Sequence, residues 1–472
     1  MTCTETLTRG NIDRQLIRLS LPLLAGSLVQ QCYNTVDLMI VSRGAGESAF
    51  AAVGVSGSVM NLFLYLLVGI TLGFSILYAN AWGAEDLPRL RQSLWSTGVL
   101  GLGTAVLLAG AGLAFLGEML TLIRTPAPLR GDCLRYLTII LAGLPLTCLY
   151  NLLAALLRAI GRTGVTLYAL GAAMICNIGL DFLLVVVLRL GVTGAAAATV
   201  TAQGLSALLC GAYLLLRYPQ LRPTRRDLRL RPDLMAQGFR YGSVSALQES
   251  SLFCGKLLIQ SAVNAMGPAA VTAFAAASCV ENFFLAFGNS GADALSVFIA
   301  QNQGAGCRER MAEGLARGLR LLLGTGIALS LLLLPLRGAA LGLLIEPGNR
   351  GAMGAAGGYL LAMAALYPIS FWTNGMQGYF RGIGRISNAF CATTLQISIR
   401  VLLTYLLPVA WGLLSVAAAT GVGWVAMVVF QQARLQGRLQ GLCPCTPPAP
   451  FSRKRGWTPK KLLSLSPLHR EA

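Results

Sequence analysis

Two aspartates lie inside long apolar stretches of this sequence, and each follows a polar residue by four positions. Asp37 follows Tyr33, and Asp181 follows Asn177. Residues four apart share one face of an α-helix. Two carboxylates with neutral oxygen donors beside them could coordinate a hard cation such as Na⁺. The same carboxylates, partly desolvated, could instead carry protons, because burial favours the neutral acid. Interhelical hydrogen bonding is the purely structural alternative.

Four further ionisable residues interrupt apolar stretches: Glu249, Lys256, Asp293 and Arg400. An ionised group in the middle of a membrane span costs about 2.5–3.5 kcal/mol on insertion scales and is commonly functional. Glu249 and Lys256 share a helical face but lie about 10 Å apart along its axis. We therefore expect Asp293 to partner Lys256 across helices in a neutralising pair. We expect Arg400 to pair with a carboxylate or with backbone carbonyls.

The composition places these charges in a membrane protein. Of 472 residues, 55% are hydrophobic and only 12% are charged, and the mean hydropathy is +0.66. An ordinary soluble domain carries about 25% charged residues. A net charge of +19 could indicate nucleic-acid binding in a soluble protein. Here the basic residues lie mostly between apolar runs, as membrane topology requires. We predict an all-α integral membrane protein whose partner is the lipid bilayer and not nucleic acid.

Several kinds of catalysis lack their residues. The single histidine, His469, lies near the C-terminus, so no histidine metal site or proton relay is expected in the membrane. Gly255-Lys256 lacks the upstream glycine and the following hydroxyl of an ATP phosphate loop. Cys443-Pro-Cys445 offers too few ligands for zinc. We expect neither an enzyme nor a bound cofactor, and uphill transport would need an ion gradient or a partner.

Twelve apolar stretches reach the length of a membrane span, about 20 residues. Pro22, Pro145, Pro368 and Pro408 lie within or at the ends of these spans, where proline can kink a helix. With a cytoplasmic N-terminus, the cytoplasmic segments hold roughly four Lys or Arg for each one outside, so both termini are predicted to be cytoplasmic. The spans are residues 16–42, 50–80, 91–117, 133–158, 164–188, 192–216, 238–264, 270–301, 314–336, 355–380, 387–408 and 411–433.

The two halves of the chain repeat one another. Each repeat has six spans, so both enter the membrane from the same side, a design of transporters with a substrate site between repeats. The predicted organisation is an N-lobe at 1–222, a cytoplasmic linker at 223–237, a C-lobe at 238–440 and a basic, disordered tail at 441–472. The matches include Gly46 with Gly267 and Asn61 with Asn282 at a shift of 221, and Tyr136 with Tyr359, Pro145 with Pro368, Asn151 with Asn374 and Arg158-Ala-Ile-Gly-Arg162 with Arg381-Gly-Ile-Gly-Arg385 at a shift of 223.

The repeat also offers an internal control for the two aspartates. Asp37 aligns with Leu258, and Asp181 aligns with Thr404. A requirement of the fold itself should recur in both halves. The carboxylate pair therefore belongs to the N-terminal half alone.

A series of short motifs now gives the chain a family likeness over about residues 15–436. Their order and spacing resemble the multidrug and toxic compound extrusion (MATE) family, and within it the DinF-like prokaryotic branch. The motifs are Leu21-Pro-Leu-Leu24, Tyr33-Asn34-x-x-Asp37, Ala51-Ala-Val-Gly-Val-Ser-Gly57, Pro145-x5-Asn151, Arg158-Ala-Ile-Gly-Arg162, Asn177-Ile-Gly-Leu-Asp181, Gly194-Ala-Ala-Ala-Ala-Thr199, Leu247-Gln-Glu-Ser-Ser-Leu-Phe253, Ile259-Gln-Ser and Gln301-Asn-Gln-Gly-Ala305.

This resemblance implies a two-lobed exporter of twelve helices that expels organic cations or drugs in exchange for H⁺ or Na⁺, in a bacterial inner membrane and as a monomer. It implies a cation site in the N-lobe made by Asp37, Asn177, Asp181, Thr199, Tyr33 and Asn151, of which the first four would hold Na⁺. The candidates for a substrate cavity are Gln30, Tyr136, Glu249, Lys256, Asp293, Asn374 and Arg400.

The chain also departs from the family pattern. Ser42 stands where the resemblance implies glycine, and Glu249 and Lys256 stand where it implies amides. Thr373-Asn374 stands where a second branch of the family has a carboxylate, which argues against a cation site in the C-lobe. Lys256 would repel organic cations if it lined the cavity unpaired.

One alternative function is a flippase of the same superfamily that moves a lipid-linked saccharide. The pyrophosphate of such a substrate would need cationic side chains in the cavity. Lys256 and Arg400 could supply them if they face the cavity unpaired, and their pairing therefore discriminates between the two functions.

Overall fold

A computed structural model describes residues 6–224, 227–346, 348–407 and 411–441. Within these residues the chain is helical almost throughout, and no strand occurs. The predicted basic tail, with Cys443, Cys445 and His469, and also Pro408 lie outside the described residues.

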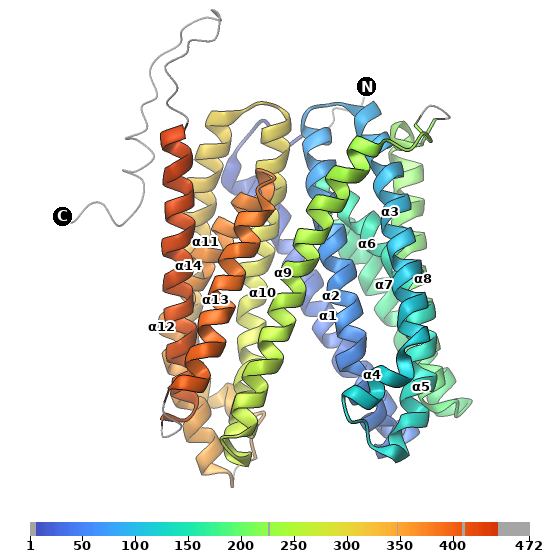
Figure 1. Cartoon of the computed structure of the whole chain (residues 1–472), viewed down its shortest axis with the longest axis vertical. Helices are drawn as coiled ribbons and strands as arrows, with labels where there is room; N and C mark the ends of the chain where they lie inside the picture. Colours follow the sequence, from blue (N-terminus) through green and yellow to red (C-terminus); the bar gives the residue numbers. More distant parts are fainter. Residues whose placement is uncertain (1–5, 225–226, 347, 408–410, 442–472) are drawn as a thin grey trace, which may run out of the picture.

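The helices form two bundles that stand side by side (Figure 1). The face at which α1 begins and α14 ends is called the terminal face below, and the opposite one the far face. The first bundle, the N-lobe, contains α1 (Ile12–Ala45), α2 (Glu47–Gly83), α3 (Leu87–Ala114), α4 (Leu116–Leu122), α5 (Ala127–Ala142), α6 (Leu144–Ala159), α7 (Thr163–Asp181), the π-helix η1 (Phe182–Val187) and α8 (Gly191–Arg217). After the 3₁₀ turn η2 (Pro219–Leu221), the C-lobe contains α9 (Pro232–Asn264), α10 (Pro268–Gly304), α11 (Arg308–Gly342), α12 (Arg350–Gly382), α13 (Ile386–Leu406) and α14 (Leu413–Gly441).

Each of the twelve predicted spans coincides with one of these rods, when α5 with α6 and α7 with η1 are each taken as one rod. Within the described residues, nine helices are long and apolar enough to cross a membrane, and ten if the bent pair α5–α6 counts as one span. The two remaining rods, α1 and α9, are long enough but more polar. They are the first helices of the two repeats, and both carry residues predicted to be functional.

The proline predictions have different outcomes. The helix containing Pro145 is interrupted at Gly143, and α5 and α6 meet at a bend of 45°. The repeat-equivalent Pro368 lies inside the continuous α12, and Pro22 lies inside the continuous α1. Glycine two residues before proline allows the break in the N-lobe, because it adds backbone freedom where the proline already removes a helical hydrogen bond.

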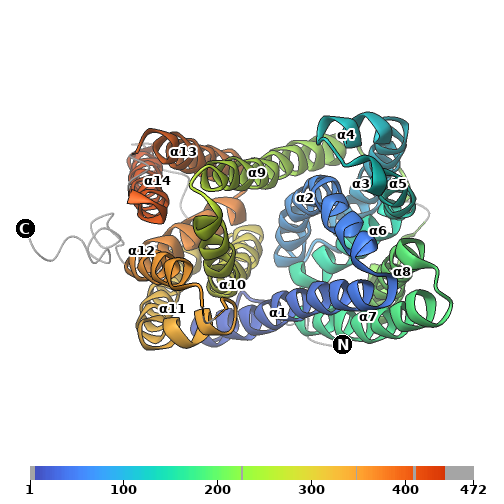
Figure 2. The same ribbon diagram turned by 90° about the horizontal axis from the view of Figure 1, so that it is seen from below.

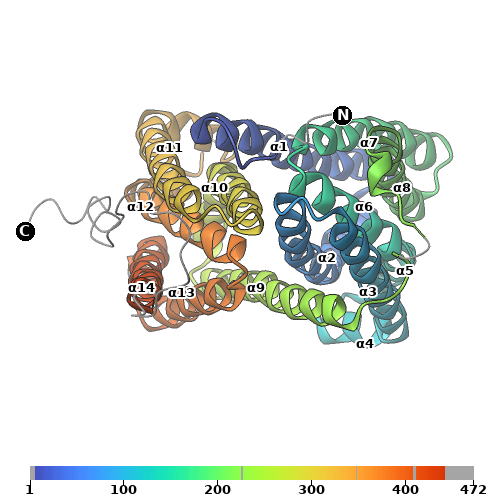
Figure 3. The ribbon, with the colours of Figure 1, turned by 90° about the horizontal axis from the view of Figure 1, so that it is seen from above.

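The two repeats exchange their first helices. Near the terminal face α1 packs against α10 and α11 of the C-lobe, while its second half packs against α7 and η1. The equivalent α9 packs against α2 and α3 of the N-lobe and then against α13. Figures 2 and 3 show α1 and α9 on opposite sides of the molecule, each reaching from one lobe to the other. The lobes are thus related by a pseudo-twofold axis along the bundle.

A pair of equivalent glycines forms the turn after each of these crossing helices. Gly46 and Gly267 have φ values of 88° and 98°. This left-handed backbone region is costly for residues with a side chain and accessible to glycine. The sequence match of Gly46 with Gly267 therefore reflects the same tight turn built twice.

The lobes meet at the terminal face through backbone contacts between α2 and α10. A Cβ atom on Gly83 would collide with the carbonyl of Gln301, and one on Gly304 would collide with the carbonyl of Asn80. The two contacts are equivalent in the two repeats, because a shift of 221 relates Gly83 to Gly304 and Asn80 to Gln301. The pseudo-twofold axis therefore passes between α2 and α10 at the point where the lobes are closest.

The residues before α1 fasten the N-lobe to the C-lobe at the same face. The backbone N–H of Leu7 donates to Gln301 Oε1 (2.9 Å), and Gln301 Nε2 donates to the carbonyl of Ala159 on α6 (2.6 Å). Arg310 Nε donates to the carbonyl of Leu7 (3.1 Å), and its Nη2 donates to Gln15 Oε1 (2.8 Å). One glutamine thus joins both lobes and the N-terminal turn.

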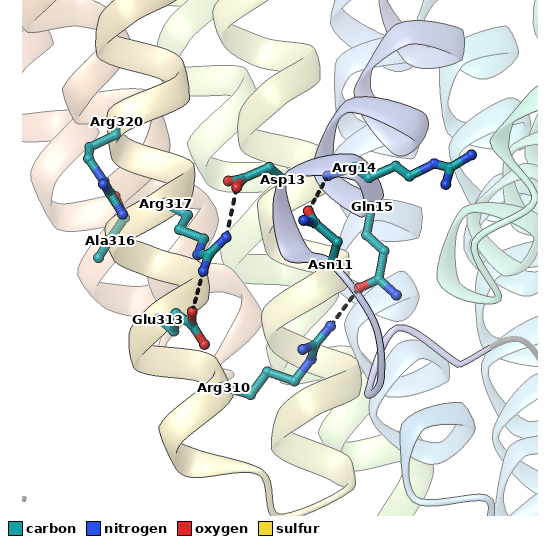
Figure 4. A network of polar contacts seen from close by, with 9 residues as sticks. All are labelled: Asn11, Asp13, Arg14, Gln15, Arg310, Glu313, Ala316, Arg317 and Arg320. Atoms are coloured by element: carbon teal, nitrogen blue, oxygen red, sulfur yellow. Dashed lines mark hydrogen bonds and ion pairs between the residues drawn. The ribbon is translucent and has the colours of Figure 1, made fainter.

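An ion pair extends this fastening along α1. Arg317 on α11 lies 2.8 Å from Asp13 in the first turn of α1 and 2.6 Å from Glu313 (Figure 4). Asn11 caps α1 by accepting from the N–H of Arg14 (3.0 Å). Partly exposed pairs of this kind contribute little stability individually. Their effect is to set the register of α1 on the C-lobe.

The linker between the lobes is tied to the N-lobe through Asp227. This carboxylate accepts from Arg91 Nε (2.8 Å) on α3 and from the N–H and hydroxyl of Thr224 (2.9 and 2.6 Å). Burial alone would raise the pKa of Asp227, but the Thr224 hydrogen bonds and the charge of Arg91 outweigh it and hold the pKa below its usual value. The anchor is therefore intact at neutral pH.

The C-lobe core is built on the close approach of α12 to α10. Gly378 and Gly382 lie one turn apart on α12, and Cβ atoms there would meet the carbonyls of Ala292 and Ser296 on α10. Small residues spaced by four allow helices in lipid to approach closely. The α10–α12 pair is therefore sensitive to added volume at these positions.

We expect Gly378→Ala to lower the stability of the purified protein by about 1–3 kcal/mol, the usual cost of overpacking a close contact. Gly358→Ala is the matched control, because it lies on the same helix with nothing within 4 Å of its added Cβ. The measurement is the thermal unfolding midpoint in detergent. Equal midpoints for the two variants would contradict the tight α10–α12 contact.

Candidate functional site

The two predicted aspartates meet in the N-lobe. Asp37 comes from α1 and Asp181 from the end of α7, and these helices pack against each other. Asp37 is 8% exposed and Asp181 is fully buried. Their carboxyl groups lie close to one another. Two buried carboxylates side by side disfavour each other's ionised form, so a proton or a small cation between them would stabilise the pair.

Hydroxyl groups surround this pair. Tyr33, one turn before Asp37, lies close to Thr199 on α8 and to both carboxylates. Thr199 itself donates to the carbonyl of Ala195 (3.0 Å), which leaves its oxygen free to accept. Tyr136 on α5 lies close to Asp37, Tyr33 and Asp181, and its hydroxyl contacts Met60 Sδ at 4.0 Å.

The predicted amides divide into two groups. Asn177 is fully buried one turn before Asp181, on the face of α7 that turns to α1. Asn151 instead donates its amide N–H to the carbonyl of Thr147 within α6 (2.9 Å), and not to either carboxylate. Gln30 donates to Asn34 Oδ1 along α1 (3.2 Å). The structure therefore joins Asn177, but not Asn151 or Gln30, to the carboxylate pair.

Many polar atoms of this cluster are buried without a hydrogen-bond partner. Within the described part of the chain, these are the Tyr33 hydroxyl, Asp37 Oδ1, both side-chain atoms of Asn177 and both carboxylate oxygens of Asp181. Unpaired buried oxygens are costly, and one cluster concentrating several of them needs an explanation. A proton or a small oxygen-liganded cation would satisfy them, so the donor set fits the H⁺ or Na⁺ implied by the sequence.

The local helix geometry changes at this cluster. The α-helix α7 ends at Asp181, and the six-residue π-helix η1 follows directly. π-helical turns are rare and occur often at functional sites. The wider turn begins immediately after the carboxylate.

The C-lobe has charged residues of its own, and one pairing differs from the prediction. Asp293 on α10 does not pair with Lys256. It lies 3.1 Å from Arg381 at the end of α12. The predicted span ended at residue 380, but the helix continues through Arg381 and turns it inward, where its side chain is 9% exposed. Glu249 lies close to the same arginine.

A second C-lobe group lies farther from the terminal face. Tyr359 on α12 donates its hydroxyl hydrogen to Glu281 Oε2 (3.2 Å), and Arg400 on α13 contacts the same hydroxyl. The charges closest to Lys256 on α9 are Glu281, Arg400 and Glu249. The carboxylate expected near Arg400 is Glu281, and the hydroxyl of Tyr359 lies between the two side chains.

Glu281 and Arg381 were missed as site residues in the sequence. Glu281 lies inside a predicted span and could have been found there. The repeat also carried a signal, because Glu281 aligns with Met60 while Tyr359 aligns with Tyr136. The tyrosine hydroxyl thus makes an equivalent contact in both lobes, with the sulfur of Met60 in the N-lobe and with the carboxylate of Glu281 in the C-lobe.

The last candidate, Asn374, packs inside the C-lobe. Its side-chain nitrogen lies against Gly288 of α10, where an added Cβ would be only 2.7 Å away. Nearby, Gln248 on α9 donates to Gln377 (2.8 Å) and to Thr393 (3.1 Å). Amides and hydroxyls thus connect α9, α12 and α13.

The architecture and the N-lobe cluster are those of a membrane transporter built from two repeats, and comparison with known proteins identifies the family. The MatE family model matches residues 22–183 and 245–406, one match in each lobe. The chain therefore belongs to the MATE family of multidrug efflux transporters.

Particular relatives agree with this assignment. The chain is 26% identical to the probable multidrug resistance protein YpnP of Bacillus subtilis, over 64% of this chain and 68% of that protein. It is 26% identical to an FAD transporter of Shewanella oneidensis, over 66% and 69%. Its fold is similar to that of a MOP superfamily transporter from Pyrococcus furiosus, with a TM-score of 0.84 at 22% identity, over 93% of this chain and 98% of that one.

The pair Asp293–Arg381 gives a stability prediction. We expect Arg381→Met to destabilise the protein by about 3 kcal/mol, the low end for breaking a buried pair, because Asp293 retains 30% side-chain exposure. Arg385→Met, four residues later at an exposed position, should have little effect. Chemical or thermal unfolding in detergent measures both. An Arg381→Met protein as stable as the Arg385→Met protein would contradict the pairing.

Proposed function

We propose that this transporter exports organic cations or drugs in exchange for H⁺ or Na⁺, and that Asp37 and Asp181 carry the coupling ion. The observation that carries this proposal is the concentration of unpartnered, buried oxygens around the two carboxylates. The fold has no comparable requirement for them, because the equivalent C-lobe positions are Leu258 and Thr404.

The coupling mechanism follows from the helices that carry these residues. Asp37, Asp181 and Thr199 lie on α1, α7 and α8, so binding a proton or cation there draws three helices together. An empty, ionised pair repels itself and separates the same helices. Asn177 and Tyr33 supply the neutral dipoles that the occupied state requires. Na⁺, if it is the ion, would be held by Asp37, Asn177, Asp181 and Thr199 through oxygen.

Alternating access requires that the lobes separate on one side at a time. The contacts between lobes lie at the terminal face, between α2 and α10 and around Gln301. Toward the far face the two bundles diverge (Figure 1). With both termini cytoplasmic, as the distribution of Lys and Arg predicts, this form is closed to the cytoplasm and faces outward. The membrane is then the inner membrane of a bacterium, and the monomer is the working unit.

Ion binding and substrate binding must oppose one another for exchange to occur. Coupling between two sites is reciprocal, so each ligand weakens the other by the same factor. Because α1 also contacts α10 and α11, a movement at Asp37 is transmitted to the C-lobe along one continuous helix. The N-lobe ion site and the contact between lobes are thus mechanically connected.

The flippase alternative depends on the compensation of its two cations. Arg400 contacts the tyrosine that binds Glu281, and Lys256 lies close to the same glutamate, so one carboxylate compensates only one of the two positive charges. The exporter proposal stays in first place because it alone uses the buried carboxylates of the N-lobe. One relative's name, FAD transporter, widens the range of cargo to consider within it.

The test is dye export from proteoliposomes under an imposed H⁺ gradient and, separately, an imposed Na⁺ gradient. We expect wild type to export ethidium, and Asp37→Asn and Asp181→Asn to lose gradient-driven export by at least about tenfold, the effect of losing roughly 1.4 kcal/mol of coupling. Asp132→Asn, which removes a carboxylate paired with the exposed Arg135, is the control and should export normally.

The gradient that drives export identifies the ion. Folding of each variant is checked by size-exclusion chromatography before reconstitution. Wild type that exports no dye under either gradient would contradict the exporter proposal. Variants that export as fast as wild type would contradict the role of the carboxylates.

A further inference from the structure

The charged residues inside the C-lobe form two groups at different depths. The group nearer the terminal face is Asp293, Arg381 and Glu249, and it carries one more negative than positive charge. The deeper group is Lys256, Glu281 and Arg400, and it carries one more positive than negative charge. On α9 the two groups are separated by the seven positions between Glu249 and Lys256 in the numbering, about 10 Å along the helix.

The two cations of the deeper group lie near one carboxylate. Glu281 accepts from Tyr359, whose hydroxyl also contacts Arg400, and Lys256 is drawn to the same glutamate. The Nε–H of Arg400 is buried and finds no acceptor among the described residues. A guanidinium presents a fork of donors suited to a carboxylate or phosphate. One further acidic group would therefore complete the arrangement.

The repeat shows that the fold does not require these charges. The N-lobe residue equivalent to Arg400 is Asn177, and the one equivalent to Glu281 is Met60. Tyr136 and Tyr359 make the same contact in the two lobes, with Met60 and Glu281 respectively. One location in the fold thus carries a cation site in the N-lobe and an excess of positive charge in the C-lobe.

Lys256 lies on the face of α9 that turns to the N-lobe. Glu249, Phe253 and Lys256 share one face of α9, and Phe253 packs against Tyr65 of α2 with ring centroids 5.3 Å apart. Lys256 is exposed, and yet its closest charges come from α10 and α13 as well as from α9. Its ammonium group therefore turns to the interior of the protein and not to lipid.

Aromatic rings border the deeper group. Tyr367 lies close to Glu281 and stacks on Phe284 with centroids 5.6 Å apart, and Tyr359 packs edge-on against Phe274 at 5.8 Å. All four rings are buried, so they form a fixed apolar wall behind the charges and not a surface open to a ligand. The excess positive charge in front of this wall favours an acidic group.

We infer that the C-lobe of this exporter contains a substrate site in which Lys256 and Arg400 bind the carboxylate or phosphate of an organic acid, with Glu281 as the competing internal anion. The inference rests on the proposed export function and specifies the class of molecule that the C-lobe accepts. When no acidic substrate is bound, Glu281 shields the two cations. When one binds, it takes up the unsatisfied donors of Arg400 and the charge of Lys256.

The test uses two dyes that differ in one group. Rhodamine 110 carries a free carboxylate, and rhodamine 123 is its methyl ester and a cation. Fluorescence anisotropy gives the dissociation constant of each dye for the purified full-length protein and its variants. We expect Lys256→Met to weaken rhodamine 110 binding about tenfold, roughly one ion–ion contact in a partly desolvated site, and to tighten binding of the cationic ester.

A second variant must act in the opposite direction. Glu281→Gln removes the competing anion, so it should tighten rhodamine 110 binding several-fold and weaken the ester. Lys256→Arg keeps the charge and should keep the preference for the acid. Opposite responses from Lys256→Met and Glu281→Gln are not the signature of a misfolded protein. Equal changes for both dyes in either variant, or none, would overturn the site.

Export measurements keep this inference separate from the proposed function. If proteoliposomes export rhodamine 123 through the Asp37–Asp181 pair but acid binding ignores Lys256, the exporter stands and the acid site is wrong. If neither dye is exported but the two variants shift acid binding in opposite directions, the acid site stands and the proposed ion-coupled export is wrong.

Discussion

An ionised side chain in the middle of a bilayer must find compensation inside the protein, because lipid supplies neither hydrogen bonds nor counter-ions. Both lobes are arranged around this constraint. In the N-lobe, two carboxylates are brought together and surrounded by hydroxyl and amide oxygens, an arrangement that a proton or a small cation would complete. In the C-lobe, carboxylates and cations largely compensate one another.

The repeat makes this difference between the lobes interpretable. The two halves share their turns, their helix order and a tyrosine contact. The backbone structure is therefore the same in both lobes, while the buried polar and charged side chains differ. Where the N-lobe has Asn177 and Met60, the C-lobe has Arg400 and Glu281. Differences at equivalent positions cannot be demands of the shared fold. They are therefore the residues at which to look for ion and substrate specificity.

The terminal face connects the two specialised interiors. The crossing helices α1 and α9 each belong to both lobes, and α2 meets α10 on the pseudo-twofold axis through glycines. Gln301 and the residues before α1 add hydrogen bonds across this junction. This junction is built from backbone packing and is reinforced by polar contacts. Under the proposed mechanism it is the side that stays closed while the other side opens.

The sequence alone determined the fold class, the twelve spans, the repeat and the N-lobe pair of Asp37 and Asp181. Apolar length and helical spacing are local properties, and so they can be read along the chain. The tertiary structure decided which charges meet. It paired Asp293 with Arg381 in place of Lys256, turned Arg381 inward, and joined Glu281 to Arg400 through Tyr359. These outcomes depend on the rotation of one helix against another, which packing sets and spacing along a single helix does not specify.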